Sequence, residues 1–116
     1  MDISKIKKRD GRIVPFEKEK ITKAIWKAAQ AVGGKDYDTA VQLTEKVVEI
    51  AQYVDEDAIA TVEAIQDLVE KVLVKNGHYK TAKAYILYRK QHEDLREASQ
   101  LFFNNKLIGD YLGKND

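Results

Sequence analysis

Two stop signals, Gly33-Gly34 and Asn76-Gly77, divide much of this chain into segments with the apolar periodicity of helices. The first segment opens at Glu17 and ends in the glycine pair, which we interpret as a left-handed helix cap. Its apolar stripe consists of Ile21, Ala24, Ile25, Ala28 and Val32. A second helix is predicted from about Asp38 to Gln52. Its inner side consists of Val41, Thr44, Val47, Val48 and Ala51.

Two further helices are predicted in the second half of the chain. Thr61 is a suitable N-cap for a helix that Asn76-Gly77 closes. Its apolar residues are Val62, Ile65, Val69, Val72 and Leu73. The fourth helix runs from about Tyr79 to Leu101, and its first half is apolar nearly all round, so we expect it to be the most buried element. The tail from Asn104 to Asp116 is expected to add one or two helical turns.

A β-hairpin is predicted near the N-terminus. Asp10-Gly11 is a preferred pair for a type I′ turn, in which both central residues have positive φ. The segment 58–60 is a candidate third strand. The predicted fold class is therefore mainly α with a small β cap (α+β). A hairpin or three-stranded cap covers a four-helix bundle, with a candidate extra C-terminal helix. We expect one regulatory domain over residues 1–95 and a helical linker over 96–116.

Composition excludes several function classes. The chain has no cysteine, so disulfides, thiol nucleophiles and Cys-based zinc sites are absent. His78 and His92 lack metal-ligand spacing, and neither Ser4 nor Ser99 lies in a nucleophile motif. No apolar run is long enough to cross a membrane, and the start lacks an apolar signal region. We therefore expect a cytoplasmic protein that does not contact membranes, and hydrolytic catalysis finds little support in these residues.

The charges are segregated although the net charge is only +1. Residues 1–30 hold nine Lys/Arg against four Asp/Glu, residues 36–70 hold one against ten, and residues 71–92 hold six against none. Two interpretations remain open. The basic segments could form a local positive site, or they could be solvated helix faces that pair with the acidic helix. Charge counts alone favour the second.

Phosphate binding is the chemistry that the N-terminal residues support best. Lys7, Lys8 and Arg9 precede the predicted turn, Arg12 follows it, and Lys20 lies in the first turn of the next helix. Exposed N–H groups at a helix start favour an anion, and each charge-assisted bond contributes about 1.5–3 kcal/mol. A basic hairpin can also be merely solvent-exposed, so the motif does not decide the function by itself.

Three runs together resemble the ATP-cone domain, found at the N-terminus of many ribonucleotide reductases and in the bacterial repressor of their genes. The runs are KKRDGRIVPFEKEKITKAI, IATVEAIQDLVEKVL and GHYKTAKAYILYRKQ, within residues 3–92. The resemblance implies a β cap over four helices that binds ATP or dATP. It also implies that ATP permits reductase activity and that dATP stops it, usually through altered oligomeric assembly.

The resemblance also implies roles for individual residues. Lys8, Arg9 and Lys20 match phosphate-binding positions, and the backbone from Val14 to Phe16 matches the segment along adenine. Gln66 falls where some members place a histidine near the nucleotide. The C-terminal helix motif is matched by Lys83, Tyr88, Arg89 and Lys90.

Some positions depart from the family pattern or carry a less specific role. The family often has a polar residue at the position of Val14 and a proline at that of Ala60, so the departures concern contacts to the base more than contacts to phosphate. We expect Mg²⁺ to bridge the phosphates, with Glu17 and Asp67 as its candidate carboxylates.

The tail LIGDYLGKND resembles the link into the body of anaerobic (glycyl-radical) or cobalamin-dependent reductases. We therefore expect an excised N-terminal fragment or a free-standing cone. The absence of cysteine argues against the repressor, which carries a zinc ribbon.

The expected function is that of an allosteric ATP/dATP-binding regulatory domain. Its partners would be a reductase catalytic domain or subunit and a second copy of the chain. The alternatives are a helical interaction module or repressor-type cone without a functional nucleotide site, and a nucleic-acid-binding regulator. The last is disfavoured by the small net charge and by the lack of an arginine-rich helix.

Overall fold

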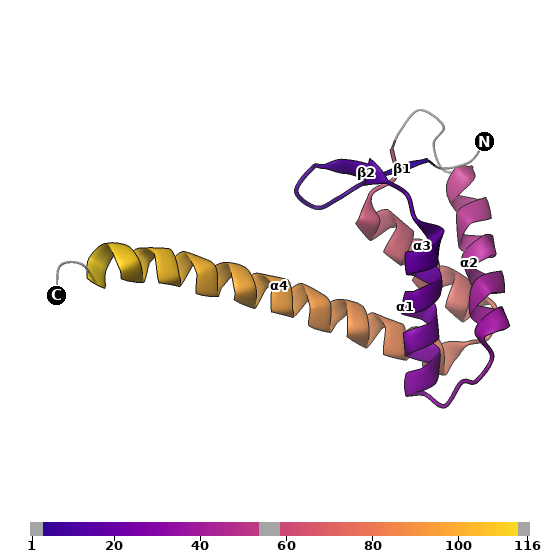
Figure 1. The fold of residues 1–116 in the computed structure, drawn as a ribbon. Coiled ribbons are helices and arrows are strands. Elements are labelled where there is room, and N and C mark those ends of the chain that lie inside the picture. Colours follow the sequence, from indigo (N-terminus) through magenta and orange to yellow (C-terminus); the bar gives the residue numbers. More distant parts are fainter. Residues whose placement is uncertain (1–3, 54–58, 114–116) are drawn as a thin grey trace. The chain divides into compact units, whose positions relative to one another are not determined.

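The structure is a computed structural model that describes residues 4–53 and 59–113. Within these ranges a two-stranded antiparallel hairpin is followed by four helices, which confirms the mainly α class with a small β cap (Figure 1). In chain order the elements are β1 (Lys5–Lys7), β2 (Ile13–Pro15), α1 (Lys18–Ala31), α2 (Tyr37–Gln52), α3 (Val62–Lys75) and α4 (Tyr79–Gly113).

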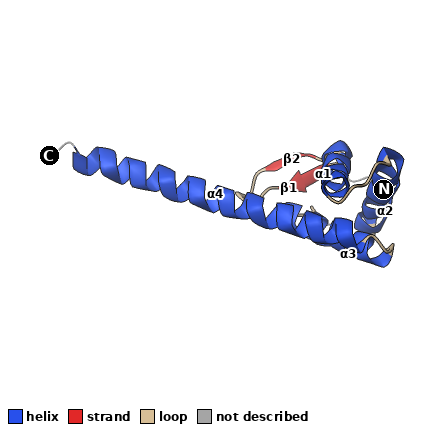
Figure 2. Cartoon of the chain, turned by 90° about the horizontal axis from the view of Figure 1, so that it is seen from below, coloured by secondary structure: helices blue, strands red, loops and turns tan. Residues whose placement is uncertain are grey.

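One apolar core joins the first three helices and the beginning of α4. α1 packs against α2, and α2 packs against α3 (Figure 2). The most completely buried apolar side chains are Ile25, Val47, Val69 and Leu73. The predicted stripes are confirmed at most positions, because a helix repeats every 3.6 residues whatever it packs against. Val32 and Val41 were wrongly placed in the core, since both are exposed.

The helix ends explain why the stop signals were informative. Gly33 has φ +88°, its N–H donates to the Gln30 carbonyl, and the Gly34 N–H donates to the Ala29 carbonyl at 2.7 Å. This is the Schellman arrangement, in which a left-handed residue lets the chain turn back onto the last carbonyls. Gly77, with φ +81°, closes α3 in the same way. The predicted caps are confirmed.

The helix starts were also predicted in part. Thr61 caps α3 by accepting a hydrogen bond from the Ala64 N–H at 3.1 Å, as expected. Asp36 caps α2 through the N–H groups of Asp38 and Thr39. Glu17 occupies the N-cap position of α1 but makes no side-chain capping hydrogen bond. Of α1, α2 and α3, it is therefore α1 that begins without a side-chain capping hydrogen bond.

The hairpin has the expected place but a different turn. Lys5, Ile6 and Lys7 pair with Pro15, Val14 and Ile13. Gly11 has φ +89°, whereas no non-glycine residue of the described chain has positive φ, so the predicted type I′ turn is wrong. The Lys8 N–H donates to the Arg12 carbonyl, which leaves a three-residue loop that ends in a left-handed glycine. The Asp10 carboxylate holds this loop through the Arg12 N–H at 3.0 Å and Nε at 2.6 Å.

The cap contains a contact to the chain before α3 but no complete third strand in the described residues. The Lys7 N–H donates to the Ala60 carbonyl at 2.9 Å, and Lys7 forms an isolated parallel bridge with Thr61. Of the candidate third strand, Ala58 lies outside the described residues, while Ile59 and Ala60 are not in a strand. This bridge attaches the hairpin to the start of α3.

The chain divides into two compact units, Met1–Ile86 and Leu87–Asp116. The first unit includes the beginning of α4, where only Ala82 and Tyr85 are buried, while Tyr79 and Ile86 remain 67% and 45% exposed. The prediction that this half-helix is the most buried element was therefore wrong, because only one face reaches the core. α4 continues through the predicted tail to Gly113. The proposed boundary at residues 95–96 stays a prediction. No helix among the described residues is long and apolar enough to span a membrane.

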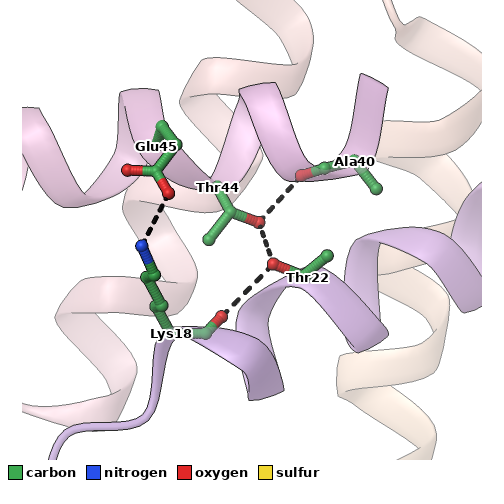
Figure 3. A network of polar contacts seen from close by, with 5 residues as sticks. All are labelled: Lys18, Thr22, Ala40, Thr44 and Glu45. Carbon is green, nitrogen blue, oxygen red and sulfur yellow. Dashed lines mark hydrogen bonds and ion pairs between the residues drawn. The ribbon is translucent and has the colours of Figure 1, made fainter. Parts of the chain in front are cut away.

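A buried pair of hydroxyl groups sets how α1 meets α2 (Figure 3). The Thr22 hydroxyl donates to Thr44 Oγ1 at 2.8 Å, and the Thr44 hydroxyl donates to the Ala40 carbonyl at 2.8 Å. Nearer the surface, Lys18 Nζ lies 2.8 Å from Glu45 Oε1. Buried hydroxyl groups need such partners, so the pair favours one register between the two helices.

Candidate functional site

The hairpin loop positions the first two predicted phosphate-binding residues. Lys8 is held by its backbone, since its N–H donates to the Arg12 carbonyl at 2.8 Å and its carbonyl accepts from the Gly11 N–H at 2.9 Å. Its side chain is half-buried, and its ammonium group has no acidic partner in the part of the chain that the structure describes. A cation whose backbone is fixed and whose charge is not neutralised nearby is suited to binding an anion.

Arg9 has a defined partner that the sequence did not indicate. Its Nε lies 2.9 Å from Glu63 Oε1, and the two side chains are 34% and 37% exposed. Glu63 belongs to the first turn of α3. The ion pair therefore joins the hairpin loop to α3, close to the bridge between Lys7 and Thr61.

The start of α1 carries the third predicted phosphate-binding residue. Lys20 lies in the first turn, and its Nζ is 3.3 Å from Glu17 Oε2 in an exposed ion pair. Glu17 makes no side-chain capping hydrogen bond, so the first N–H groups of α1 keep no side-chain acceptor from the N-cap, although Glu19 places one carboxylate in the same turn. Lys20 and the uncapped N–H groups favour an anion at this helix end.

The segment that leads into α1 is fixed against the core. Phe16 is half-buried against the apolar cluster, and its N–H donates to the Ser4 carbonyl at 3.0 Å. Val14 is half-buried and pairs with Ile6 in the hairpin. The backbone expected to lie along adenine is thus held at both ends.

Gln66 is the one residue whose buried polar atom lacks a partner among those described. Its Oε1 is buried and accepts no hydrogen bond. A buried acceptor without a donor costs about 1–3 kcal/mol, so such an atom commonly marks a place where a ligand or water completes the bonding. A nucleotide offers suitable donors in its amino and hydroxyl groups.

The two carboxylates considered for Mg²⁺ do not form a protein metal site. Glu17 is engaged by Lys20, and Asp67 lies exposed on α3 with an interaction of its own. The described residues contain no group of three His, Asp or Glu side chains that could hold a metal ion. This arrangement suits Mg²⁺ only where phosphate oxygens supply most of its ligands. The role of both residues stays a prediction.

Residues 4–94 match the family described as the ATP cone domain. The matched range contains the hairpin, α1, α2, α3 and the first half of α4. The chain belongs to the ATP-cone family. ATP cones are regulatory domains of ribonucleotide reductases that bind ATP or dATP, so the described chain is a regulatory rather than a catalytic unit.

Relatives of this ATP cone include reductases of more than one kind. It is 45% identical over 104 residues to a vitamin B12-dependent ribonucleoside-diphosphate reductase of Thermoplasma acidophilum, covering 85% of this chain and 13% of that protein. A reductase with the same description from Mycobacterium tuberculosis is 36% identical over 98 residues, covering 84% and 13%. The anaerobic ribonucleoside-triphosphate reductase of Salmonella typhimurium is 35% identical over 92 residues, covering 79% and 12%. The chain thus spans a small fraction of each relative.

The remaining predicted residues of this ATP cone lie on α4. Lys83 is exposed in the first unit, whereas Tyr88, Arg89 and Lys90 belong to the second unit. The Tyr88 ring lies against His92, with ring centres 4.2 Å apart. A hydrogen bond from Lys90 to Asp94, whose oxygen is 3.2 Å away, raises the pKa of the lysine. The ligand roles of these four residues stay predictions.

The main feature missed by sequence reasoning is Glu63. The sequence shows it in the first turn after Thr61, where a carboxylate is favoured by the helix dipole whatever lies nearby. Nothing local indicates that an arginine 54 positions earlier is its partner. Only the bridge between Lys7 and Thr61 makes that pairing visible.

Proposed function

We propose that this ATP cone binds ATP or dATP with the phosphates on Lys8, Arg9 and Lys20, and that the bound nucleotide regulates a ribonucleotide reductase. The observation that carries the proposal is the hairpin loop, in which backbone hydrogen bonds fix Lys8 and the ion pair with Glu63 positions the Arg9 side chain. Phosphate contacts of this kind supply affinity. We expect Mg²⁺ to bridge the phosphates and the protein to act in the cytoplasm.

Discrimination between the two nucleotides requires other groups. ATP and dATP differ only at the ribose 2′-position, so equal phosphate contacts cannot separate them. We infer that Gln66, with its buried acceptor, and the backbone from Val14 to Phe16 face the sugar and base. A coupling of about 1–3 kcal/mol between two assembly states is enough for regulation. The partners of those states would be a reductase catalytic domain or subunit and further copies of the chain.

Calorimetric titration with ATP and with dATP tests the proposal. Lys8→Ala and Lys20→Ala should each weaken binding about tenfold to a hundredfold, the loss of one charge-assisted contact. Lys23→Ala is the matched control, because Lys23 is an exposed lysine of α1 without an ion pair among the described residues. It should leave the affinity within about twofold.

Two outcomes would decide between the proposal and its alternative. Absence of heat with either nucleotide at millimolar concentration would exclude a nucleotide site and favour a helical interaction module. Equal losses of nucleotide affinity in Lys8→Ala, Lys20→Ala and Lys23→Ala would show that the positive charges act diffusely and do not form a specific binding site. Light scattering with and without dATP then tests whether the nucleotide changes the oligomeric state.

A further inference from the structure

We propose that Glu63 is a built-in competitor for the nucleotide: its carboxylate holds Arg9 in the nucleotide-free domain, and phosphate must replace it. The inference rests on the proposed function, because it assigns the residue that sets the affinity of the same site. It predicts that removing the charge of Glu63 tightens nucleotide binding.

The backbone explains why these two side chains meet. The parallel bridge pairs Lys7 with Thr61, so both segments run in the same direction from that point. Advancing two residues along each segment reaches Arg9 and Glu63, whose Nε and Oε1 are 2.9 Å apart. The bridge thus holds the start of the hairpin loop beside the first turn of α3, which brings the two side chains within reach of each other. It is not a chance encounter of two long surface side chains.

The position of Glu63 makes it a stable counter-ion. It lies in the first turn of α3, where the N-cap hydroxyl of Thr61 binds the Ala64 N–H and the helix dipole favours a negative charge. The carboxylate is thus stabilised even when Arg9 leaves it. An exchange of partners is therefore feasible, with phosphate taking the arginine and the helix end retaining the glutamate.

The charges give the sign of the effect. A carboxylate beside Arg9 neutralises the attraction of that guanidinium for an incoming polyanion and also repels the phosphates directly. Both side chains are about one-third exposed, so solvent weakens the pair but does not abolish it. Lys8 has no such acidic partner among the described residues, so it can make the first contact with phosphate before Arg9 is released.

Glu63→Gln and Glu63→Ala test the proposal in titrations with ATP, dATP and inorganic tripolyphosphate. Glutamine keeps a carbonyl oxygen that can accept the Arg9 Nε–H but removes the charge, whereas alanine removes both. Each variant should bind all three probes about two- to fivefold more tightly than wild type, in line with a partly exposed ion pair. The gain should shrink as salt concentration rises.

Glu49→Gln is the control, since it removes the same charge from an exposed residue of α2 that has no ion pair among the described residues. A gain confined to the Glu63 variants supports the proposal. If the wild type binds but Glu63→Gln shows no gain in affinity, the inference is overturned while the proposed function stands. Weaker binding by Glu63→Ala would also overturn the inference, because Glu63 would then be a positioning residue. Absence of binding by every form would overturn both.

Discussion

Replacing Thr44 with valine keeps the shape of a buried side chain and removes one hydroxyl group from the contact between α1 and α2. Thr44 is 1% exposed, and its oxygen accepts the Thr22 hydroxyl at 2.8 Å. After the change, the other acceptor that the described residues offer this hydroxyl is the Lys18 carbonyl at 3.4 Å, the long limit for a hydrogen bond. Thr22 is 6% exposed, so water can replace the lost partner only poorly.

The magnitude follows from which groups are left unpaired. The Ala40 carbonyl keeps its helical N–H donor when the Thr44 hydroxyl is lost, so it adds little cost. The Thr22 hydroxyl is left with a poor acceptor, which costs about 1–2 kcal/mol of the free energy of unfolding. Thr22→Val costs less, about 0.5 kcal/mol, because the Thr44 hydroxyl still donates to Ala40. The double valine variant should be close to wild type, since both partners are replaced by apolar groups of the same shape.

Urea unfolding followed by fluorescence measures these differences. Trp26 is the single tryptophan of the chain, and it packs against the core from α1 with an edge contact to Tyr37. In thermal unfolding of the same variants, a loss of 1 kcal/mol in the free energy of unfolding should lower the melting temperature by about 4–8 °C. Thr81→Val is the control, because Thr81 is half-buried and makes no side-chain hydrogen bond among the described residues. A double variant that is as unstable as the sum of the two single variants would refute the reasoning.

Two further predictions concern the ends of elements. Gly34→Ala would place a Cβ 2.9 Å from the Ala29 carbonyl oxygen, so the cap of α1 must shift. The free energy of unfolding should fall by about 1–3 kcal/mol in the same urea assay. An unchanged urea midpoint would contradict this prediction. The Arg12 backbone N–H, and then its guanidinium, hold the pKa of Asp10 below the usual aspartate value. The loop should therefore be supported by Asp10 at neutral pH and lose that support as the pH falls through the lowered pKa. A carboxyl NMR titration with a midpoint at or above the usual value would count against it.

The candidate site could be predicted in its parts but not in its connections. The basic loop, Lys20 and the N-cap at Thr61 are local features, and the sequence indicated each of them through turn chemistry or charge. The partner of Arg9 could not be predicted, because it depends on the register between two segments far apart in sequence. The same holds for the buried oxygen of Gln66, which has no local signature.

The sequence by itself determined where the helices stop and which stripes are apolar, because glycine caps and a 3.6-residue repeat act within a few positions. Only the tertiary structure decided how much of each stripe is covered. Val41 lies on a predicted inner side and is exposed, and α4 buries Ala82 and Tyr85 while Ile86 remains in contact with solvent. The hairpin loop is a separate case, because the bonds between Asp10 and Arg12 that favour a three-residue turn over type I′ are local and the turn prediction did not consider them. Burial and long-range pairing depend on neighbouring elements, which no local pattern specifies.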